Sequence, residues 1–170
     1  MTRDRDPAGR PRNARPRDAL GRPLDRRGDT GAARVPDDLV FSGPEAARLA
    51  DQMLRAGRPF HAHEVLEASW KSGPAAERDL WQGLAQIAVG LTHAHRGNAP
   101  GAVTLLRRGA QRVQAYLDQG GLAPDADHPY GIDVAGFLAA SDDLADRIER
   151  DGLGRLPASD LRPGLLTAGT

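Results

Sequence analysis

The sequence predicts an all-α fold: a compact bundle of about five helices preceded by a disordered tail rich in Arg and Pro. Apolar residues recur at spacings of three and four along five segments of the chain, as in amphipathic helices. No segment shows sustained alternation of apolar and polar residues, which argues against β-strands. Gly and Pro clusters separate the segments, and 170 residues suit one ordinary domain.

Residues 1–34 are predicted to form the disordered basic tail. They hold ten Arg and five Asp, and their large apolar groups, Leu20 and Leu24, are too few to offset the entropy of ordering. Guanidinium groups suit phosphate, so a weak nucleic-acid contact is one interpretation of the Arg-rich run. The interspersed Asp residues and the lack of aromatics favour a solvated tail instead. A third interpretation is that the segment around Leu20 and Leu24 docks on the domain.

The first helix is predicted to begin at Ser42, with Pro44 in its first turn and Glu45 completing a capping box. It should end at Gly57, and the second helix should begin at about Pro59. The apolar stripe of the first helix consists of Ala46, Leu49, Ala50, Met53 and Leu54.

The third helix, about Ala75 to Arg96, follows a short break at Ser72-Gly73-Pro74 and should therefore pack antiparallel to the second. It has no charged residue between Asp79 and Arg96, which predicts a central position in the bundle. Its helical wheel has three sides. The apolar side holds Trp81, Leu84, Ile87, Ala88 and Leu91; the polar side holds Gln82, Gln86, Val89 and His93; the third holds Gly83 and Gly90, where a neighbouring helix could approach closely.

A fourth helix is predicted from the apolar spacing between Ala102 and Leu117. After a loop at residues 119–131, Asp133 can cap a fifth helix. The buried side of the fifth helix should consist of Val134, Phe137, Leu138, Leu144, Ala145 and Ile148. We therefore expect residues 35–151 to form the helical domain and residues 152–170 to form a loose C-terminal tail.

The second helix carries the residues that chemistry would need. Phe60, His63, Leu66, Glu67 and Trp70 share one face, which we expect to be buried and to carry the imidazole and carboxylate inward. Buried polar groups need partners, and the polar side of the third helix could supply them. The candidate polar cluster consists of His63, Glu64, Glu67, Gln82, Gln86 and His93.

A divalent metal is a candidate cofactor, because His63 and Glu67 at i and i+4 suit joint coordination and His93 could add a third ligand. The pattern differs from the His-Glu-x-x-His of zinc peptidases because it ends in Glu67, although Glu64 takes the general-base position. The chain has no Cys, which excludes thiolate sites. The corresponding function would be a metal-dependent, hydrolytic enzyme of unknown substrate.

Two other interpretations need no metal. The cluster could be a structural network that fixes the register of the central helices, or it could line a small-molecule pocket walled by Phe60, Trp70 and Trp81. We favour a binding or scaffold domain over an enzyme, with a small ligand or a second copy of the chain as candidate partners. No catalytic residue can be named. His61, His95 and His128 are expected to be surface or helix-end histidines.

A cytoplasmic location is expected. The sequence starts without an apolar run of signal-peptide type, and the longest uncharged stretch, Leu80 to His95, is too short and too polar to span a bilayer. No membrane partner is therefore expected.

Several motifs occur in a fixed order: His63-Glu-Val-Leu-Glu67, Trp70, Trp81-Gln-Gly-Leu-Ala-Gln-Ile-Ala88, His93 and Arg96-Gly-Asn98. Together they closely resemble the prokaryotic family called domain of unknown function 309. The resemblance covers roughly residues 45–117. It implies a compact all-helical domain and no established activity.

Overall fold

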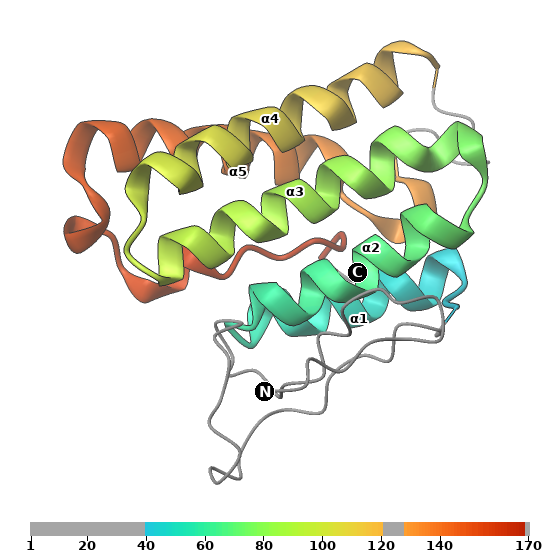
Figure 1. The fold of residues 1–170 in the computed structure, drawn as a ribbon, viewed down its shortest axis with the longest axis horizontal. Helices are drawn as coiled ribbons and strands as arrows, with labels where there is room; N and C mark the ends of the chain where they lie inside the picture. The colour runs from blue at the N-terminus through green and yellow to red at the C-terminus, as the bar shows by residue number, and fades with distance from the viewer. Residues whose placement is uncertain (1–39, 121–127, 169–170) are drawn as a thin grey trace, which may run out of the picture.

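The structure is a computed structural model that describes residues 40–120 and 128–168, and its fold is a helical bundle (Figure 1). The all-α prediction is confirmed, since an isolated bridge between Ile132 and Leu166 is the only β-type pairing within the described ranges. The predicted N-terminal tail lies outside the described residues. The α-helices are α1 (Gly43–Arg55), α2 (Pro59–Ser72), α3 (Arg78–His95), α4 (Ala99–Asp118) and α5 (Val134–Asp151). The described residues also form the short 3-10 helices η1 (Ala75–Glu77), η2 (Pro129–Gly131), η3 (Leu153–Arg155) and η4 (Ala158–Leu161).

Helices α1 and α5 begin at the predicted caps, whereas α3 begins at Arg78, because residues 75–77 of the predicted third helix form η1. The Ser42 hydroxyl accepts a hydrogen bond from the Glu45 amide at 3.4 Å, and the Glu45 carboxylate accepts one from the Ser42 amide at 3.0 Å, which completes the capping box. The Asp133 side chain caps α5 by accepting from the Gly136 amide at 2.9 Å. These caps satisfy amides that have no partner within their own helix.

Helix α3 occupies the centre of the bundle, as its lack of charge predicted. It packs against α2 on one side and α4 on the other, while α1 packs on α2 and α5 packs on α4 (Figure 1). Eleven of its 18 residues are buried, including Trp81, Leu84 and Leu91. The core is therefore built around α3, and the other helices cover it.

Glycines bring the backbones of α3 and α4 into contact. A Cβ atom on Gly109 would lie 2.6 Å from the Gly83 carbonyl oxygen, and one on Gly83 would lie 2.8 Å from the Gly109 carbonyl oxygen. A Cβ on Gly90 would lie 2.9 Å from the Leu106 amide nitrogen. The close approach predicted for the glycine side of α3 is confirmed, and α4 is the helix that makes it.

The C-terminal segment is not the loose tail that we expected. Leu165 is completely buried, and Leu161 and Leu166 pack against the core. Isolated Leu residues among Gly and Pro show no helical period, so the sequence pattern alone did not reveal this packing. The segment crosses back over the bundle after η4.

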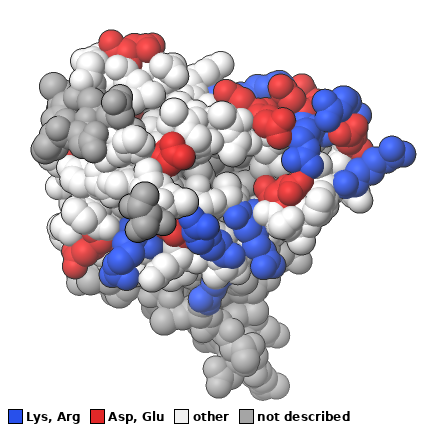
Figure 2. Space-filling view, turned by 180° about the vertical axis from the view of Figure 1, so that it is seen from behind, with Lys and Arg blue, Asp and Glu red and all other residues white. Residues whose placement is uncertain are grey.

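Charge is unevenly distributed over the surface. On the face opposite that of Figure 1, side chains of both signs gather at one end of the molecule (Figure 2). Ion pairs of the C-terminal half of α5 account for much of this charge: Arg107 of α4 contacts Asp146 and Glu149, and Arg150 contacts Asp151. Such exposed pairs contribute little to stability. In the described part of the chain, every helix is too short or too polar to cross a membrane.

The glycine contact yields a prediction about stability. Gly109→Ala should lower the free energy of unfolding by about 1–3 kcal/mol, because its methyl group would overpack the α3–α4 contact. Gly154→Ala is the matched control: a Cβ there meets nothing within 4 Å, so the change should stay within about 0.5 kcal/mol. Urea unfolding followed by circular dichroism measures both, and equal effects of the two substitutions would contradict the close approach.

Candidate functional site

Helix α2 buries a different face from the one predicted. Its buried residues are Pro59, His61, Ala62, Val65, Leu66 and Ser69. Of the predicted face only Leu66 is fully buried, while Phe60, His63, Glu67 and Trp70 are half-buried. The small residues Ala62 and Ser69 allow neighbouring helices to pack closely, whereas our prediction gave most weight to the large aromatics.

The prediction for His61 was wrong, because its side chain lies inside the bundle. His61 is only 2% exposed, although we expected it to face the solvent. His95 does lie at a helix end, as predicted, and His128 is exposed.

His63 and Glu67 form a dyad on α2, as their spacing predicted. The His63 Nε2 and Glu67 Oε2 atoms are 3.4 Å apart, and the side chains are 24% and 34% exposed. The other carboxylate oxygen of Glu67 contacts Lys71 Nζ at 2.7 Å. Burial lowers the pKa of His63 below its ordinary value, more than Glu67 and the Ala85 backbone raise it. The dyad therefore favours a neutral imidazole beside a carboxylate that already has a cationic partner.

The polar residues of α3 take separate directions. Gln82 Oε1 accepts a hydrogen bond from Arg112 of α4 at 2.7 Å, so Gln82 turns toward α4 and not toward α2. His93 Nδ1 lies 2.9 Å from Asn98 Nδ2, in the turn that begins α4. Gln86 follows Ala85, the residue whose backbone interacts with His63. Among the candidates on α3, Gln86 is thus the one directly next to the residue that interacts with His63.

The candidate metal ligands are not gathered in one place. Within residues 40–120 and 128–168, no group of three or more His, Asp and Glu side chains is arranged to hold a metal ion. His93 lies eight residues beyond Ala85, which is about 12 Å along a helix. The expected set of His63, Glu67 and His93 is therefore not assembled.

The three predicted pocket walls have separate surroundings. Trp81 is 2% exposed and stacks on Tyr130, with ring centroids 5.6 Å apart. Phe60 lies 6.0 Å from the His63 ring, and Lys71 Nζ lies 5.9 Å from the Trp70 ring. Phe60 and Trp70 are ten residues apart, or about 15 Å along α2. Their positions describe an elongated surface and not the walls of one small pocket.

A buried carboxylate that we did not predict lies at the start of α3. Glu77 is 8% exposed, and it accepts hydrogen bonds from Trp81 Nε1 at 3.0 Å and from the Tyr130 hydroxyl at 2.5 Å. The i,i+4 spacing of Glu77 and Trp81 was a signal that we could have used. Tyr130 had no such signal, because it follows 53 residues later.

Tyr130 is constrained by its backbone as well as by its contacts. Its φ angle is 59°, in the left-handed region that few non-glycine residues adopt. Its ring lies against Gly43 at the start of α1, where an added Cβ would be 2.5 Å from the ring. Burial and the neighbouring Glu77 raise the pKa of Tyr130 to about 12. These contacts tie the segment before α5 to α1 and α3.

Residues 48–105 match a family described as Domain of unknown function (DUF309). This segment is similar to DUF309, as its motifs predicted. It runs from within α1 into α4 and contains the His63–Glu67 dyad. We call residues 48–105 the DUF309-like segment.

One curated relative is "Uncharacterized protein YpuF" from Bacillus subtilis (strain 168). It is 40% identical over 57 residues, which are 33% of this chain and 33% of the relative. The match thus spans about a third of the relative's length. No solved structure shows a significant match to the chain.

The first prediction from this region concerns Tyr130. Tyr130→Phe should lower the free energy of unfolding by about 1–3 kcal/mol at neutral pH, because Glu77 loses a buried hydrogen bond. The folded pKa of about 12 exceeds the ordinary 10.0, so the stabilisation should be complete below pH 10 and disappear as the pH rises through 12. Urea unfolding against pH measures both effects, with Glu77→Gln and the double variant closing a mutant cycle. Additive effects would contradict the coupling.

A second prediction concerns His63. Its pKa is lowered in the folded state, so its contribution to stability should be complete above the ordinary value of about 6.5 and be lost as the pH falls through the folded pKa. His63→Gln should remove part of this acid sensitivity, and another part should remain because burial also lowers the pKa of His95. NMR titration of the imidazole Cε1 protons checks the direction, and a His63 pKa above the ordinary value would contradict it.

Proposed function

We propose that the protein is a binding domain that recognises a partner protein through the outer surface of the α2–α3 hairpin. We define the α2–α3 face as Phe60, His63, Glu67, Trp70 and Gln86, all half-buried. It combines aromatic side chains with polar groups, a composition typical of protein interfaces. The α2–α3 face lies wholly within the DUF309-like segment.

One observation carries the proposal. The Oε1 atom of Gln86 is buried and has no hydrogen bond from the described residues. The Nδ1 atom of His63 is also buried, and the Ala85 backbone interacts with this ring without forming a hydrogen bond of normal geometry. Leaving such an atom without a partner costs about 1–3 kcal/mol. Both atoms are enclosed, but their side chains are half-exposed, so a rotation of either side chain brings the atom to the surface. A partner that supplied hydrogen-bonding groups to the rotated side chains would remove this cost, so these two residues favour recognition of a polar surface.

The shape of the α2–α3 face favours a protein partner over a small molecule. Phe60 and Trp70 mark its two ends, about 15 Å apart along α2. Small-molecule sites enclose most of the ligand surface, whereas this face presents a row of half-buried side chains. A helix or extended segment of another protein can lie along such a row and contact both aromatics.

A metal-dependent hydrolase receives less support from the geometry. The His63–Glu67 pair supplies two ligands, and Glu67 is already paired with Lys71. His93 contacts Asn98 instead of completing a ligand set. We therefore do not propose a metal-assisted reaction.

Photo-crosslinking tests the proposal. A benzoylphenylalanine placed at position 86 should give one dominant adduct in the host cells, whereas the same group at position 139, on the exposed side of α5, should not. The captured protein should then be expressed and titrated against the purified full chain. Gln86→Arg should weaken binding by about tenfold or more, which corresponds to about 1.4 kcal/mol.

The matched control is Ala139→Arg, which should leave both the affinity and the melting temperature unchanged. Two results would refute the α2–α3 face as the binding surface. One is an equal yield of adducts from positions 86 and 139, and the other is a captured protein that binds Gln86→Arg as tightly as the wild type. Circular dichroism of each variant separates lost binding from lost folding.

A further inference from the structure

The C-terminal segment occupies a site built by other parts of the chain. We define the strap as residues 158–168, which comprise η4 and the chain that follows it. The strap contacts α1, α3 and α5 as well as the segment between η2 and α5. Figure 1 shows it returning along the bundle after α5. It lies entirely outside the DUF309-like segment.

Asp51 of α1 binds the backbone of the strap. Its Oδ1 atom accepts hydrogen bonds from the amides of Leu165 at 2.7 Å and Leu166 at 3.1 Å. Arg55 also donates to this carboxylate, at 2.9 Å. Burial opposes ionisation, but the bonds from Arg55, Leu166 and Leu165 outweigh it and lower the pKa of Asp51. Asp51 thus recognises two consecutive backbone N–H groups, whatever side chains they carry.

The segment before α5 adds a second row of backbone contacts. The Asp133 amide donates to the Leu165 carbonyl at 3.0 Å, and the Thr167 amide donates to the Gly131 carbonyl at 3.0 Å. Ile132 and Leu166 form an antiparallel bridge between these hydrogen bonds. Leu165 inserts its side chain completely into the core. Backbone pairing combined with one buried side chain is a common way of binding extended peptides.

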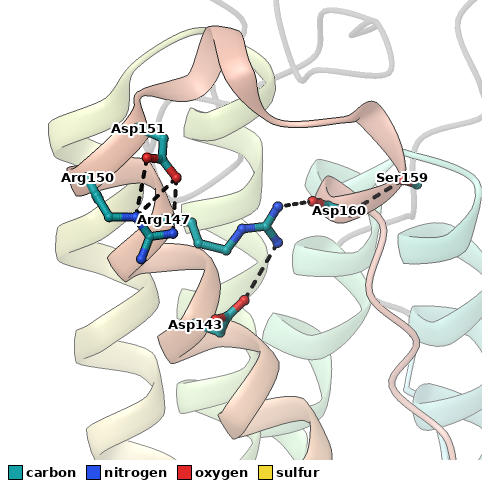
Figure 3. Close-up of polar contacts among 6 residues, drawn as sticks. All are labelled: Asp143, Arg147, Arg150, Asp151, Ser159 and Asp160. Carbon is teal, nitrogen blue, oxygen red and sulfur yellow. Dashed lines mark hydrogen bonds and ion pairs between the residues drawn. The ribbon is translucent and has the colours of Figure 1, made fainter.

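The start of the strap is fixed by polar contacts. His95 Nε2 lies 3.1 Å from the Leu161 carbonyl oxygen, a contact in which the imidazole donates. Arg147 of α5 pairs with Asp160 of the strap and reaches Asp143 of its own helix at 3.6 Å (Figure 3). An acidic residue five positions before the buried Leu is therefore part of what the groove recognises.

We propose that the groove formed by α1, α3, α5 and residues 131–133 is a binding site for an extended, leucine-containing peptide of a partner protein, and that the strap is its intramolecular competitor. The groove residues Asp51 and His95 belong to the DUF309-like segment, whereas their strap partners do not. The groove and its occupant are thus separate in sequence. This groove is distinct from the α2–α3 face.

The contacts define the chemistry of the partner peptide. It needs an acidic residue for Arg147, a large aliphatic residue five positions later in place of Leu165, and free backbone N–H groups at the positions of Leu165 and Leu166. Proline at the position of Leu166 would remove one of the two N–H donors that Asp51 accepts. Proline is tolerated at position 163 of the strap, because the N–H groups that Asp51 binds belong to Leu165 and Leu166.

The strap is suited to displacement. Leu165 is its only fully buried residue, and Leu161 and Leu166 remain half-buried. Its other contacts are the partial packing of Leu161 and Leu166, a few hydrogen bonds and one ion pair, so it should open without unfolding the helices. Hydrogen exchange of the unmodified full chain tests this: the Leu165 and Leu166 amides should exchange at least tenfold faster than the Leu91 amide in α3. Equal rates would mean that the strap opens only on global unfolding, and would refute the proposal.

A labelled peptide with the sequence of residues 158–168 tests binding to the groove. Fluorescence anisotropy should show weak binding to the wild-type full chain, where the strap competes, and at least tenfold tighter binding to Leu165→Ser, whose own strap is weakened. Adding Asp51→Asn to Leu165→Ser should abolish that gain, and so should a peptide with proline at the position of Leu166. Circular dichroism confirms that each variant is folded.

The proposal would be overturned if the peptide bound Leu165→Ser no more tightly than the wild type. It would also be overturned if the peptide with proline at the position of Leu166 bound as tightly as the unmodified peptide. The strap of a second copy of the chain is the alternative occupant of the groove, and sedimentation of the wild type tests for it by measuring the oligomeric state. A concentration-dependent dimer that Leu165→Ser dissociates would overturn the partner-peptide assignment in favour of exchange between copies. A monomer at all concentrations supports the competitor role of the strap.

Discussion

The close contact between α3 and α4 is the constraint on which the rest of the structure depends. Gly83 and Gly109 each leave space for the carbonyl oxygen of the other, so the two backbones meet with no side chain between them. This contact fixes the rotation of α3 about its own axis. Once the glycine side faces α4, Trp81 and Leu84 face the core, and Gln86 is left half-buried. The position of every α3 side chain follows from that rotation.

The order of helices could be predicted because it depends on local patterns. The caps at Ser42 and Asp133 act within one helical turn, and the uncharged stretch lies within the single helix α3, so each appears where the sequence places it. The candidate cluster depended on the relative rotation of two helices, which local patterns do not determine. Gln82 could bind Arg112 or a group on α2, and the sequence offered no means of choosing between them.

The two buried carboxylates were missed for the same reason. In the sequence, Asp51 and Glu77 look like ordinary acidic residues on the surface of a helix. Each nevertheless accepts a hydrogen bond from a residue more than 50 positions later. Both join a remote segment to the helices: Asp51 binds the strap, and Glu77 binds Tyr130. A buried carboxylate with good donors is a strong constraint on chain path, because removing a donor leaves the charge unsatisfied.

The DUF309-like segment does not build the whole core of this protein. It supplies α2, α3 and parts of α1 and α4, but the core also contains Ile132, Phe137 and Leu165, which lie beyond residue 105. Leu165 and Phe137 are 0% and 3% exposed, so they bury surfaces that the matched helices would otherwise leave in water. A shorter protein built on the same segment must cover those surfaces by other means. A partner protein could cover them, and this is the physical reason for proposing that the groove under the strap binds a partner peptide.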